Sequence, residues 1–372
     1  MTTTRALIVR VWDIGIRLFH WTLVALVAAS AVTGFILGLE TLAWHLLAGE
    51  AIIVLLGWRV VWGVLGTAYA RFSSFAYAPR DVLAHLGELG RGRAHRHLGH
   101  NPLGAMMVFG LIAVLAAIVV TGVVALGGML KQGPLRAFLS YATGTGALDV
   151  HNILAILLLV MIGLHLAGVG FESWRGRENL VRAMVTGAKN TVPAGEAAPP
   201  VRVRTGLAMG VTLGLLAVGA AGVAGMASLP GRGVPPADAD PVFAAQCGAC
   251  HLAFPASLAP AATWNGILAD LQHHFGADAT LSADQVGQIK GWLDANSAEH
   301  WDTLPAHMLR VPAADGSDRI TDTPGWRRLH RDIPAATFTA KPVYRRSNCE
   351  ACHADAATGL FSPQNIAIPP MP

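Results

Sequence analysis

Long apolar runs dominate the first two thirds of the chain, and polar residues gather between them. A helix needs about 20 residues to cross the roughly 30 Å of hydrocarbon in a bilayer. The pattern predicts five membrane-spanning helices, at residues 14–38, 44–65, 103–127, 149–170 and 206–229. The first run is too long for the apolar core of a secretion signal and lacks a clear small-residue cleavage site, so we expect it to be retained.

The pattern changes near the fifth run. That run is rich in Gly and Ala, and since small residues let helices approach closely, we expect a tether helix packed against the bundle. The Pro- and Gly-rich stretch LPGRGVPPADADP then predicts a linker. Residues 240–372 show short helical patterns, such as 282–296, between long irregular stretches. We therefore expect an all-α membrane protein that ends in a mostly helical and irregular soluble domain with a modest apolar core.

Basic residues set the expected orientation. They concentrate in the segments 66–102 and 171–205, whereas 128–148 has only Lys131 and Arg136. Because cytoplasmic loops carry the excess of Lys and Arg, we expect a cytoplasmic N-terminus in the bacterial inner membrane. Five spans then place the C-terminal domain in the periplasm. The net charge of +4 is explained by this topology and indicates no nucleic-acid partner.

All four cysteines belong to two copies of one motif. The motif reads Cys-x-x-Cys-His, at Cys247, Cys250 and His251 and at Cys349, Cys352 and His353. Two such thiols join the vinyl groups of a c-type haem, and the adjacent His is placed to bind its iron. A Cys pair alone could be a redox dithiol or half a zinc site, but the His after each pair favours haem. A zinc ribbon or structural disulfides are the alternatives to haem. The motifs predict two haem c, attached on the periplasmic side.

Four histidines lie within the predicted spans. Ionisable residues there are costly and are functional candidates. By depth they form an inner pair, His20 and His165, and an outer pair, His45 and His151. His151 and His165 are 14 residues apart, close to four helical turns, so they face the same way about 21 Å apart. We predict two haem b in a four-helix bundle, each held by one pair. The alternative is core histidines bonded to polar neighbours.

The remaining histidines before the fifth span fall in one loop, at His85, His95, His97 and His100. We expect them to be solvated, or to belong to the helix start in GHNPLG, where Asn101-Pro102 favours a helix N-terminus. We assign none of them to a metal.

Four segments resemble a known family: VWDIGIRLFHW, RVVWGVLGTAYARFSSF, GHNPLG and HNILAILLLVMIGLHL. They are similar to the b-type cytochrome subunit of nickel–iron hydrogenases and related bacterial di-haem cytochromes b, over about residues 8–185. The resemblance implies two b haems ligated by the two histidine pairs, and contact with quinone. Arg17 and Arg59 lie near the cytoplasmic ends of their spans, where haem propionates need cations. Ordinary flanking charge is the alternative for both.

The C-terminal domain resembles a second family. HHFGADATLS, RITDTPGWRRLHRDIP, SNCEACHADAATGLFS and IAIPP are similar to bacterial di-haem cytochromes c, across nearly all of 240–372. That family has two histidines per haem, which implies His274 and His330 as the second ligands. By sequence proximity, His274 goes with the first haem and His330 with the second.

From the residues alone, the second ligands of the c haems stay open among His273, His274, His300, His307, Met308, His330 and Met371. His273 competes with His274, since adjacent helical residues point about 100° apart and only one can face the iron. Met308 is the main other competitor, with core packing as its alternative role.

The sequence thus predicts three parts. Residues 1–185 form a transmembrane di-haem cytochrome b domain with four spans. Residues 186–239 hold a cytoplasmic loop, the fifth span and the linker, and residues 240–372 form a periplasmic di-haem cytochrome c domain.

No nucleotide-binding glycine loop and no hydrolase signature is visible in the sequence, so we assign no catalytic side chain and leave the chemistry to the cofactors. We expect electron transfer between the membrane quinone pool and a periplasmic partner, such as a soluble cytochrome or oxidoreductase, with quinol oxidation favoured. The alternative is a haem-bearing anchor subunit of a hydrogenase or other periplasmic oxidoreductase. A haem-based sensor or reductase would need an open ligand site. Oligomeric state is open, with a homodimer as one option.

Overall fold

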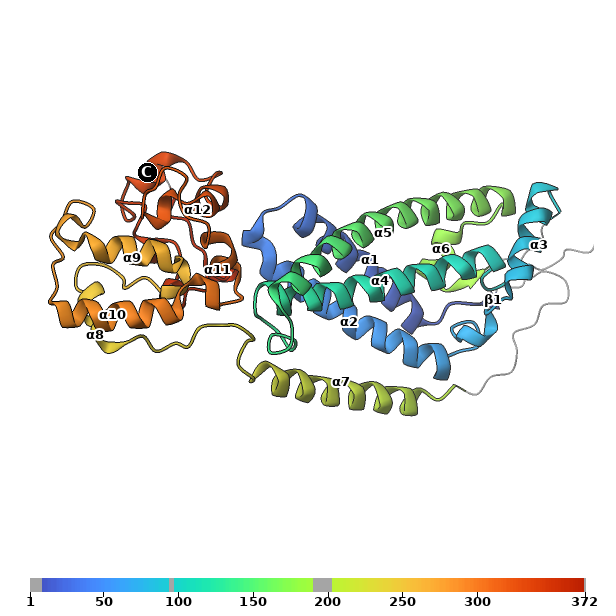
Figure 1. Cartoon of the computed structure of the whole chain (residues 1–372). Coiled ribbons are helices and arrows are strands. Elements are labelled where there is room, and N and C mark those ends of the chain that lie inside the picture. The colour runs from blue at the N-terminus through green and yellow to red at the C-terminus, as the bar shows by residue number, and fades with distance from the viewer. Residues whose placement is uncertain (1–8, 94–96, 190–202, 371–372) are drawn as a thin grey trace, which may run out of the picture. The chain divides into compact units, whose positions relative to one another are not determined.

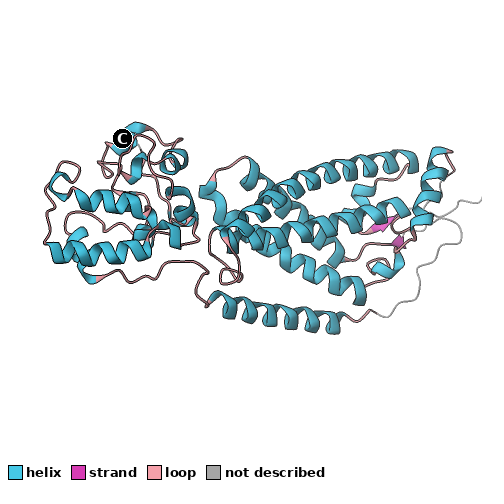
Figure 2. Cartoon of the chain, viewed as in Figure 1, coloured by secondary structure: helices cyan, strands magenta, loops and turns pink. Residues whose placement is uncertain are grey.

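A computed structural model describes residues 9–93, 97–189 and 203–370 of the chain. Almost all of its regular structure is helical (Figures 1 and 2). Two short strands, β1 (Val9–Arg10) and β2 (Ala188–Lys189), pair antiparallel. The all-α architecture expected from the sequence is confirmed.

Five of the described helices are long and apolar enough to cross a membrane. They are α1 (Ile14–Phe35), α2 (Leu42–Leu65), α4 (Pro102–Met129), α5 (Tyr141–Gly176) and α7 (Thr205–Ala227). The five predicted spans are confirmed. α5 extends beyond its predicted span at both ends.

The chain folds as two compact units. The first comprises Met1–Gly122 and Leu148–Gly222, and the second comprises Val123–Ala147 and Val223–Pro372. In the first unit, α1, α2, α4 and α5 form the four-helix bundle (Figure 1). Its apolar centre holds Ile52, Leu56, Leu115 and Leu158, with side chains of α1 packed against them. All four helices therefore share one core.

Two polar residues begin α1 and α4. Asp13 caps α1 by accepting a hydrogen bond from the Ile16 amide at 2.9 Å. Its second oxygen accepts from Trp62 Nε1 at 3.2 Å and Thr67 Oγ1 at 2.6 Å, which ties the start of α1 to the end of α2. Before α4, Asn101 Oδ1 accepts from the Gly104 amide at 2.7 Å, so the helix start predicted at Asn101-Pro102 is confirmed.

The helix α7 departs from expectation. Ala208 is its only residue in a described buried cluster. A Cβ added at any of its glycines, Gly206, Gly210, Gly214, Gly219, Gly222 and Gly225, would meet nothing within 4 Å. Packing of small residues against the bundle is therefore confined to the start of this span, where Ala208 joins the cluster of Ile16, Val61 and Trp62. The rest of the predicted packing is not seen, since the glycines of the described helix have no neighbour there.

The short helices α3 (Pro79–Gly90) and α6 (Leu180–Thr186) complete the first unit. The loop histidines here are less solvated than predicted. His85 is only 4% exposed, and its ring lies 5.9 Å from that of His97. His95 lies outside the described residues.

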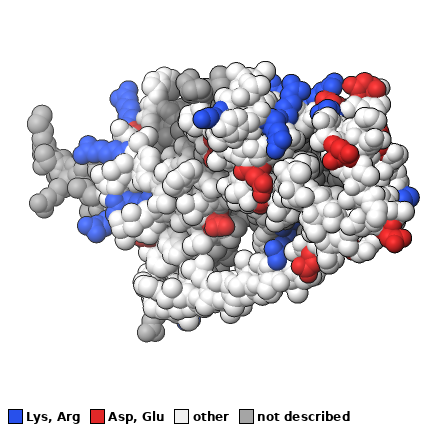
Figure 3. Space-filling model, turned by 90° about the vertical axis from the view of Figure 1, so that its left-hand side faces the viewer, with Lys and Arg blue, Asp and Glu red and all other residues white. Residues whose placement is uncertain are grey.

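The second unit holds five short helices, α8 (Pro241–Cys247), α9 (Ala261–Ala269), α10 (Ala283–Asn296), α11 (Leu304–Leu309) and α12 (Pro324–Leu329). Two small apolar clusters form its core. One is built around Phe243, Trp264 and Ile289, and the other around Leu258, Leu309 and Trp326. On the face drawn in Figure 3, basic and acidic side chains are interspersed, so no continuous patch of one sign covers it.

A buried polar network lies in the second unit, where the loop between α4 and α5 meets α11. Lys131 is 4% exposed and donates to Asp302 Oδ2 and to the Leu139 carbonyl, both at 3.0 Å. Asp302 also accepts from the Tyr141 amide at 2.8 Å and His307 Nε2 at 2.9 Å. Burial raises the pKa of Asp302, but these hydrogen bonds outweigh it and hold the pKa below its usual value. The network thus stabilises the unit above that pKa and weakens as pH falls through it.

Replacing Asp302 with Ala should destabilise the second unit by about 3 kcal/mol, because Lys131 stays buried without a counter-charge. Chemical unfolding of the full chain, followed by the absorbance of the C-terminal domain's haems, measures the loss. Asp332→Ala is the control, since Asp332 and its partner Arg331 are 86% and 71% exposed. Equal unfolding midpoints for the two variants would contradict the role of the network.

Candidate haem-binding sites

The first Cys-x-x-Cys-His motif places its histidine opposite a second one. His251 follows α8, and His274 ends the short turn at Leu271–His273. Their ring centres are 6.2 Å apart and their planes differ by 17°. An iron bound by two imidazole nitrogens at about 2 Å each holds the ring centres about 6 Å apart. The separation therefore fits an iron between the two rings.

The neighbouring residue His273 points elsewhere. Its side chain is 75% exposed, and its Nδ1 lies 2.8 Å from Asp270 Oδ1. The structure therefore brings His274, rather than His273, to the first motif.

The second motif is built in the same way from other elements. His353 follows the turn Cys349–Ala351, and His330 ends α12. Their ring centres are 6.1 Å apart, and the planes differ by 74°. His330 Nδ1 lies 2.9 Å from the Trp326 carbonyl. Since a carbonyl only accepts, Nδ1 carries the proton and Nε2 is left free for iron.

Burial sets the protonation state of the histidines and cysteines at these sites. It lowers the pKa of His274, His330 and His353, so the rings stay neutral, which is the form that binds a metal. Burial also raises the pKa of Cys349 to about 11. A thiol that resists ionisation is a poor redox nucleophile, which disfavours a dithiol centre. Among the described residues, no three His, Cys, Asp or Glu side chains converge on one position.

The other candidate ligands of the C-terminal domain have different partners. His300 Nε2 lies 3.0 Å from the Asp294 carbonyl, and His307 belongs to the Asp302 network. Met308 packs against the cluster of Leu258 and Trp326. Met371 lies outside the described residues.

In the membrane bundle, the outer pair has the same spacing. The rings of His45, from α2, and His151, from α5, have centres 6.1 Å apart and planes 68° apart. His151 Nδ1 lies 2.9 Å from the Ile118 carbonyl, and His45 Nδ1 lies 3.2 Å from the Ser30 carbonyl. Each bond leaves Nε2 for a metal. The pair fits an iron held between α2 and α5.

The inner pair, His20 and His165, is close enough to interact electrostatically. Around it lie buried polar atoms that find no hydrogen-bond partner: Arg17 Nε, His20 Nδ1, Arg59 Nη1 and His100 Nδ1. Arg59 is 4% exposed, and its guanidinium covers the Phe72 ring at 4.3 Å. A buried charge is costly unless an opposite charge compensates it. These donors therefore fit an anionic group such as a haem propionate.

The sequence left His100 either solvated or part of the helix start before α4, and did not predict its burial. Its ring packs between Trp12 at 4.8 Å and Phe75 at 4.6 Å. Burial, with smaller effects of Arg59, Lys189 and His165, lowers its pKa to about 3, so it is neutral at physiological pH. Its place directly before the helix-start residue Asn101 was the available signal, since a residue there is held against the bundle end.

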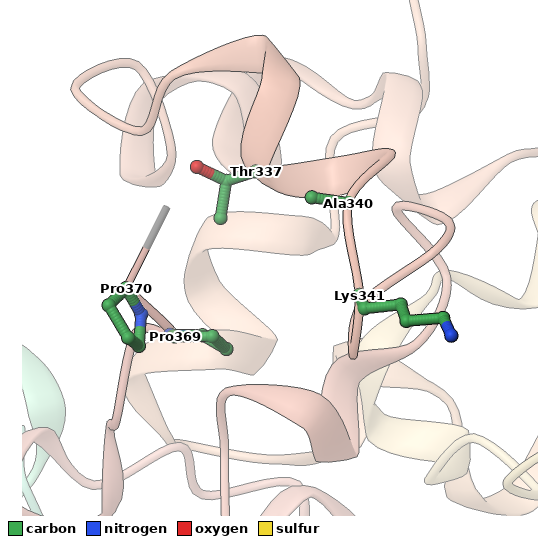
Figure 4. A pocket seen from close by; sticks show the side chains of 5 residues that line it. All are labelled: Thr337, Ala340, Lys341, Pro369 and Pro370. Carbon is green, nitrogen blue, oxygen red and sulfur yellow. The ribbon is translucent and has the colours of Figure 1, made fainter. Parts of the chain in front are cut away.

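Figure 4 shows a hollow in the second unit, lined by Thr337, Ala340, Lys341, Pro369 and Pro370. Its empty space is about 160 Å³, and that volume includes space open to solvent. Small-molecule sites typically span about 300–1,000 Å³, so this hollow is no substrate site.

A helical membrane bundle with paired histidines, followed by two paired histidine sites at Cys-x-x-Cys-His motifs, defines a membrane cytochrome with b-type and c-type haem. The model of the family described as prokaryotic cytochrome b561 matches residues 11–187. The model described as dihaem cytochrome c matches residues 243–361. The C-terminal domain belongs to the dihaem cytochrome c family, and the preceding part of the chain matches the cytochrome b561 model, which is consistent with a fusion of the two. Both resemblances seen in the sequence are confirmed.

The C-terminal domain is also similar to solved structures. A dihaem cytochrome c (DHC) purified from Rhodobacter sphaeroides is 37% identical over 33% of this chain and 98% of that chain, with a TM-score of 0.27. A diheme cytochrome type c from Shewanella baltica is 31% identical over 36% of this chain and 95% of that chain, with a TM-score of 0.29. No curated protein matches the chain. The families make this a bacterial membrane protein that transfers electrons with haem b and haem c.

Replacing His330 with Ala should leave both c haems covalently attached and turn one of them high-spin, because its iron loses an axial ligand. Visible and electron paramagnetic resonance (EPR) spectra of the oxidised protein measure the change. His273→Ala is the control, because His273 is exposed and bonded to Asp270. Two fully low-spin c haems in His330→Ala would show that the assignment is wrong.

Replacing His165 with Ala should remove one b haem and leave both c haems in place. The b and c haem contents of the purified protein, determined spectroscopically as pyridine complexes, test this. His300→Ala, outside the proposed sites, should keep all haems. If both b haems survive unaltered in His165→Ala, that histidine is not a ligand.

Proposed function

We propose that the chain carries electrons between the membrane quinone pool and a periplasmic redox partner, using two haem b and two haem c, with quinol as the donor. The observation that carries the proposal is the repeated spacing of histidine pairs. The first c site, the second c site and the outer pair hold their ring centres 6.2, 6.1 and 6.1 Å apart. Unrelated elements produce the same gap, which an iron between two imidazoles requires.

The proposed topology has a cytoplasmic N-terminus and a periplasmic C-terminal domain. It is supported by the excess of Lys and Arg in the segments 66–102 and 171–205. It is also supported by the chemistry of Cys-x-x-Cys-His motifs, since haem c is attached on the periplasmic side in bacteria. The inner pair would then lie toward the cytoplasm and the outer pair toward the periplasm.

Oxidation of one quinol to quinone releases two electrons and two protons. Bound haem supplies one-electron transfer between ferrous and ferric iron. The chain's residues position the carriers and keep water out. On α5, His151 and His165 offer one imidazole at each depth, about 21 Å apart along the helix. Ile52, Leu56, Leu115 and Leu158 fill the bundle between them with apolar side chains. The axial histidines also occupy the positions at which a sensor or reductase would bind small molecules.

The anchor-subunit alternative rests on the b-type resemblance alone. The fused dihaem cytochrome c domain supplies redox sites of its own on the proposed outer side, where a catalytic partner would dock. That domain favours an electron carrier with a soluble partner, such as a periplasmic cytochrome or oxidoreductase.

Adding a water-soluble quinol to the purified protein should reduce the b haems first and the c haems after them. Rapid mixing with the b and c α-bands recorded separately measures the order. In His165→Ala, reduction of the c haems by quinol should slow at least tenfold, whereas dithionite should still reduce them fully. If no quinol analogue reduces either haem type, and none inhibits their reoxidation, the proposal fails.

A further inference from the structure

Two helices of the bundle carry the same short sequence. Residues 28–34 of α1 read AASAVTG, and residues 116–122 of α4 read AAIVVTG, with five of seven positions identical. Each segment faces one histidine of the outer pair. The segment of α1 contacts His45 on α2, and the segment of α4 contacts His151 on α5. The repeat therefore marks two equivalent helix pairs, α1 with α2 and α4 with α5.

The threonine of each segment is oriented by its own helix. Thr33 Oγ1 donates to the Ala29 carbonyl, and Thr121 Oγ1 donates to the Ala117 carbonyl, both at 2.8 Å. With its proton used in this way, each hydroxyl offers a lone pair to a neighbour. That neighbour is a histidine nitrogen in both places. Thr33 Oγ1 lies 3.1 Å from His45 Nδ1, and Thr121 Oγ1 lies 3.4 Å from His151 Nδ1.

A backbone carbonyl three residues before each threonine contacts the same nitrogen. The Ser30 carbonyl lies 3.2 Å from His45 Nδ1, and the Ile118 carbonyl lies 2.9 Å from His151 Nδ1. Both neighbours of each Nδ1 are therefore acceptors, so Nδ1 must carry the proton. The unprotonated nitrogen is Nε2, the one available to iron.

The glycine after each threonine leaves room for the imidazole. A Cβ at Gly34 would lie 3.3 Å from His45 Cε1, and one at Gly122 would lie 3.2 Å from His151 Cε1. Both contacts are tighter than ordinary van der Waals distance, so a side chain there would displace or turn the ring. By contrast, a Cβ added at Gly163 or Gly168 of α5 would meet nothing within 4 Å.

We propose that these two segments are matched cradles that position His45 and His151 as the axial pair of one haem b. In this proposal Thr33 and Thr121 are positioning residues that bond Nδ1, and Gly34 and Gly122 admit the rings. The inference rests on the haem assigned to the outer pair and deepens it. It predicts that both cradles tune the same haem, because the two histidines, with ring centres 6.1 Å apart, would hold one iron between them.

Replacing Thr33 or Thr121 with Val removes one acceptor from Nδ1 and keeps the shape of the side chain. A weaker bond at Nδ1 makes the imidazole a poorer electron donor to iron, which favours the ferrous state. Each variant should therefore raise the midpoint potential of one and the same b haem. We expect a shift of up to about tenfold in the equilibrium constant for its reduction, about 59 mV for one electron. Potentiometric titration of the b α-band measures it.

The controls separate positioning from general packing. Thr212→Val on α7 removes the same kind of hydrogen bond, from Thr212 Oγ1 to the Ala208 carbonyl, with no histidine beside it. It should leave all potentials unchanged. Thr33→Ser and Thr121→Ser keep the hydroxyl and should restore the original potential. A valine variant that loses the haem, while its serine counterpart keeps it, supports the cradle in the same way.

Three results would overturn the proposal. The first is a shift of different haems by the valine variants at 33 and 121. The second is no larger shift than in Thr212→Val, and the third is failure of the serine variants in the same way as the valine variants. Titration by a chemical reductant needs no quinol, so these outcomes are independent of the electron donor. His45→Ala, which should remove the haem itself, distinguishes a failed cradle from a wrong haem assignment.

Glycine variants give a spectroscopic test of the same cradles. Gly34→Ala and Gly122→Ala should turn one imidazole and change the EPR anisotropy of the oxidised haem, because the angle between the ring planes sets the splitting of the iron d orbitals. Gly163→Ala is the control, since a Cβ there meets nothing. An unchanged b-haem spectrum in both cradle variants would contradict the close contact.

Discussion

The proposed haem sites depend on one distance, the gap of about 6 Å between ring centres that an iron bound by two imidazoles would require. Three histidine pairs keep this gap although they are built from different elements. In the bundle, α2 and α5 supply the rings, and in the C-terminal domain short turns and helix ends supply them. Each pair needs rigid neighbours, because side chains that wander cannot hold two nitrogens on one metal. The helix caps, the apolar clusters and the carbonyl partners of Nδ1 provide that rigidity.

Polar groups in the bundle are few, and most are committed to a structural partner. Asp13 joins the start of α1 to the end of α2 through three hydrogen bonds. Several buried atoms near the inner pair are exceptions among the described residues, and the clearest is Arg59, which is 4% exposed and whose Nη1 has no hydrogen-bond partner. A buried donor without a hydrogen-bond partner is expensive, so these atoms fit an anionic cofactor group at the inner pair. At the inner pair, the groups that are costly to bury are therefore also the candidates for function, as intramembrane histidines are in general.

The three histidine pairs share one spacing but differ in ring angle, and the angle does not follow the kind of haem. The planes are 17° apart at the first c site, 74° at the second and 68° at the outer pair. In the bundle the angle follows from two helix pairs with equivalent contacts, each with a threonine and a glycine beside one histidine. In the C-terminal domain no such repeat operates, and His330 is fixed by the carbonyl of its own helix at Trp326. Backbone carbonyls therefore contact Nδ1 of both outer-pair histidines and of His251 and His330 in the C-terminal domain.

The sequence by itself determined the five spans, the two haem-attachment motifs and the family of each domain, because apolar length and Cys-x-x-Cys-His spacing are local properties. It left His273 and His274 unresolved, overestimated the packing of α7 and treated His100 as a loop residue. Those questions depend on contacts between residues that are far apart in the sequence, such as the contact between His45 Nδ1 and the Ser30 carbonyl. Only the tertiary structure decided them, because a ring's partner and its burial are set by packing between elements that sequence spacing does not relate.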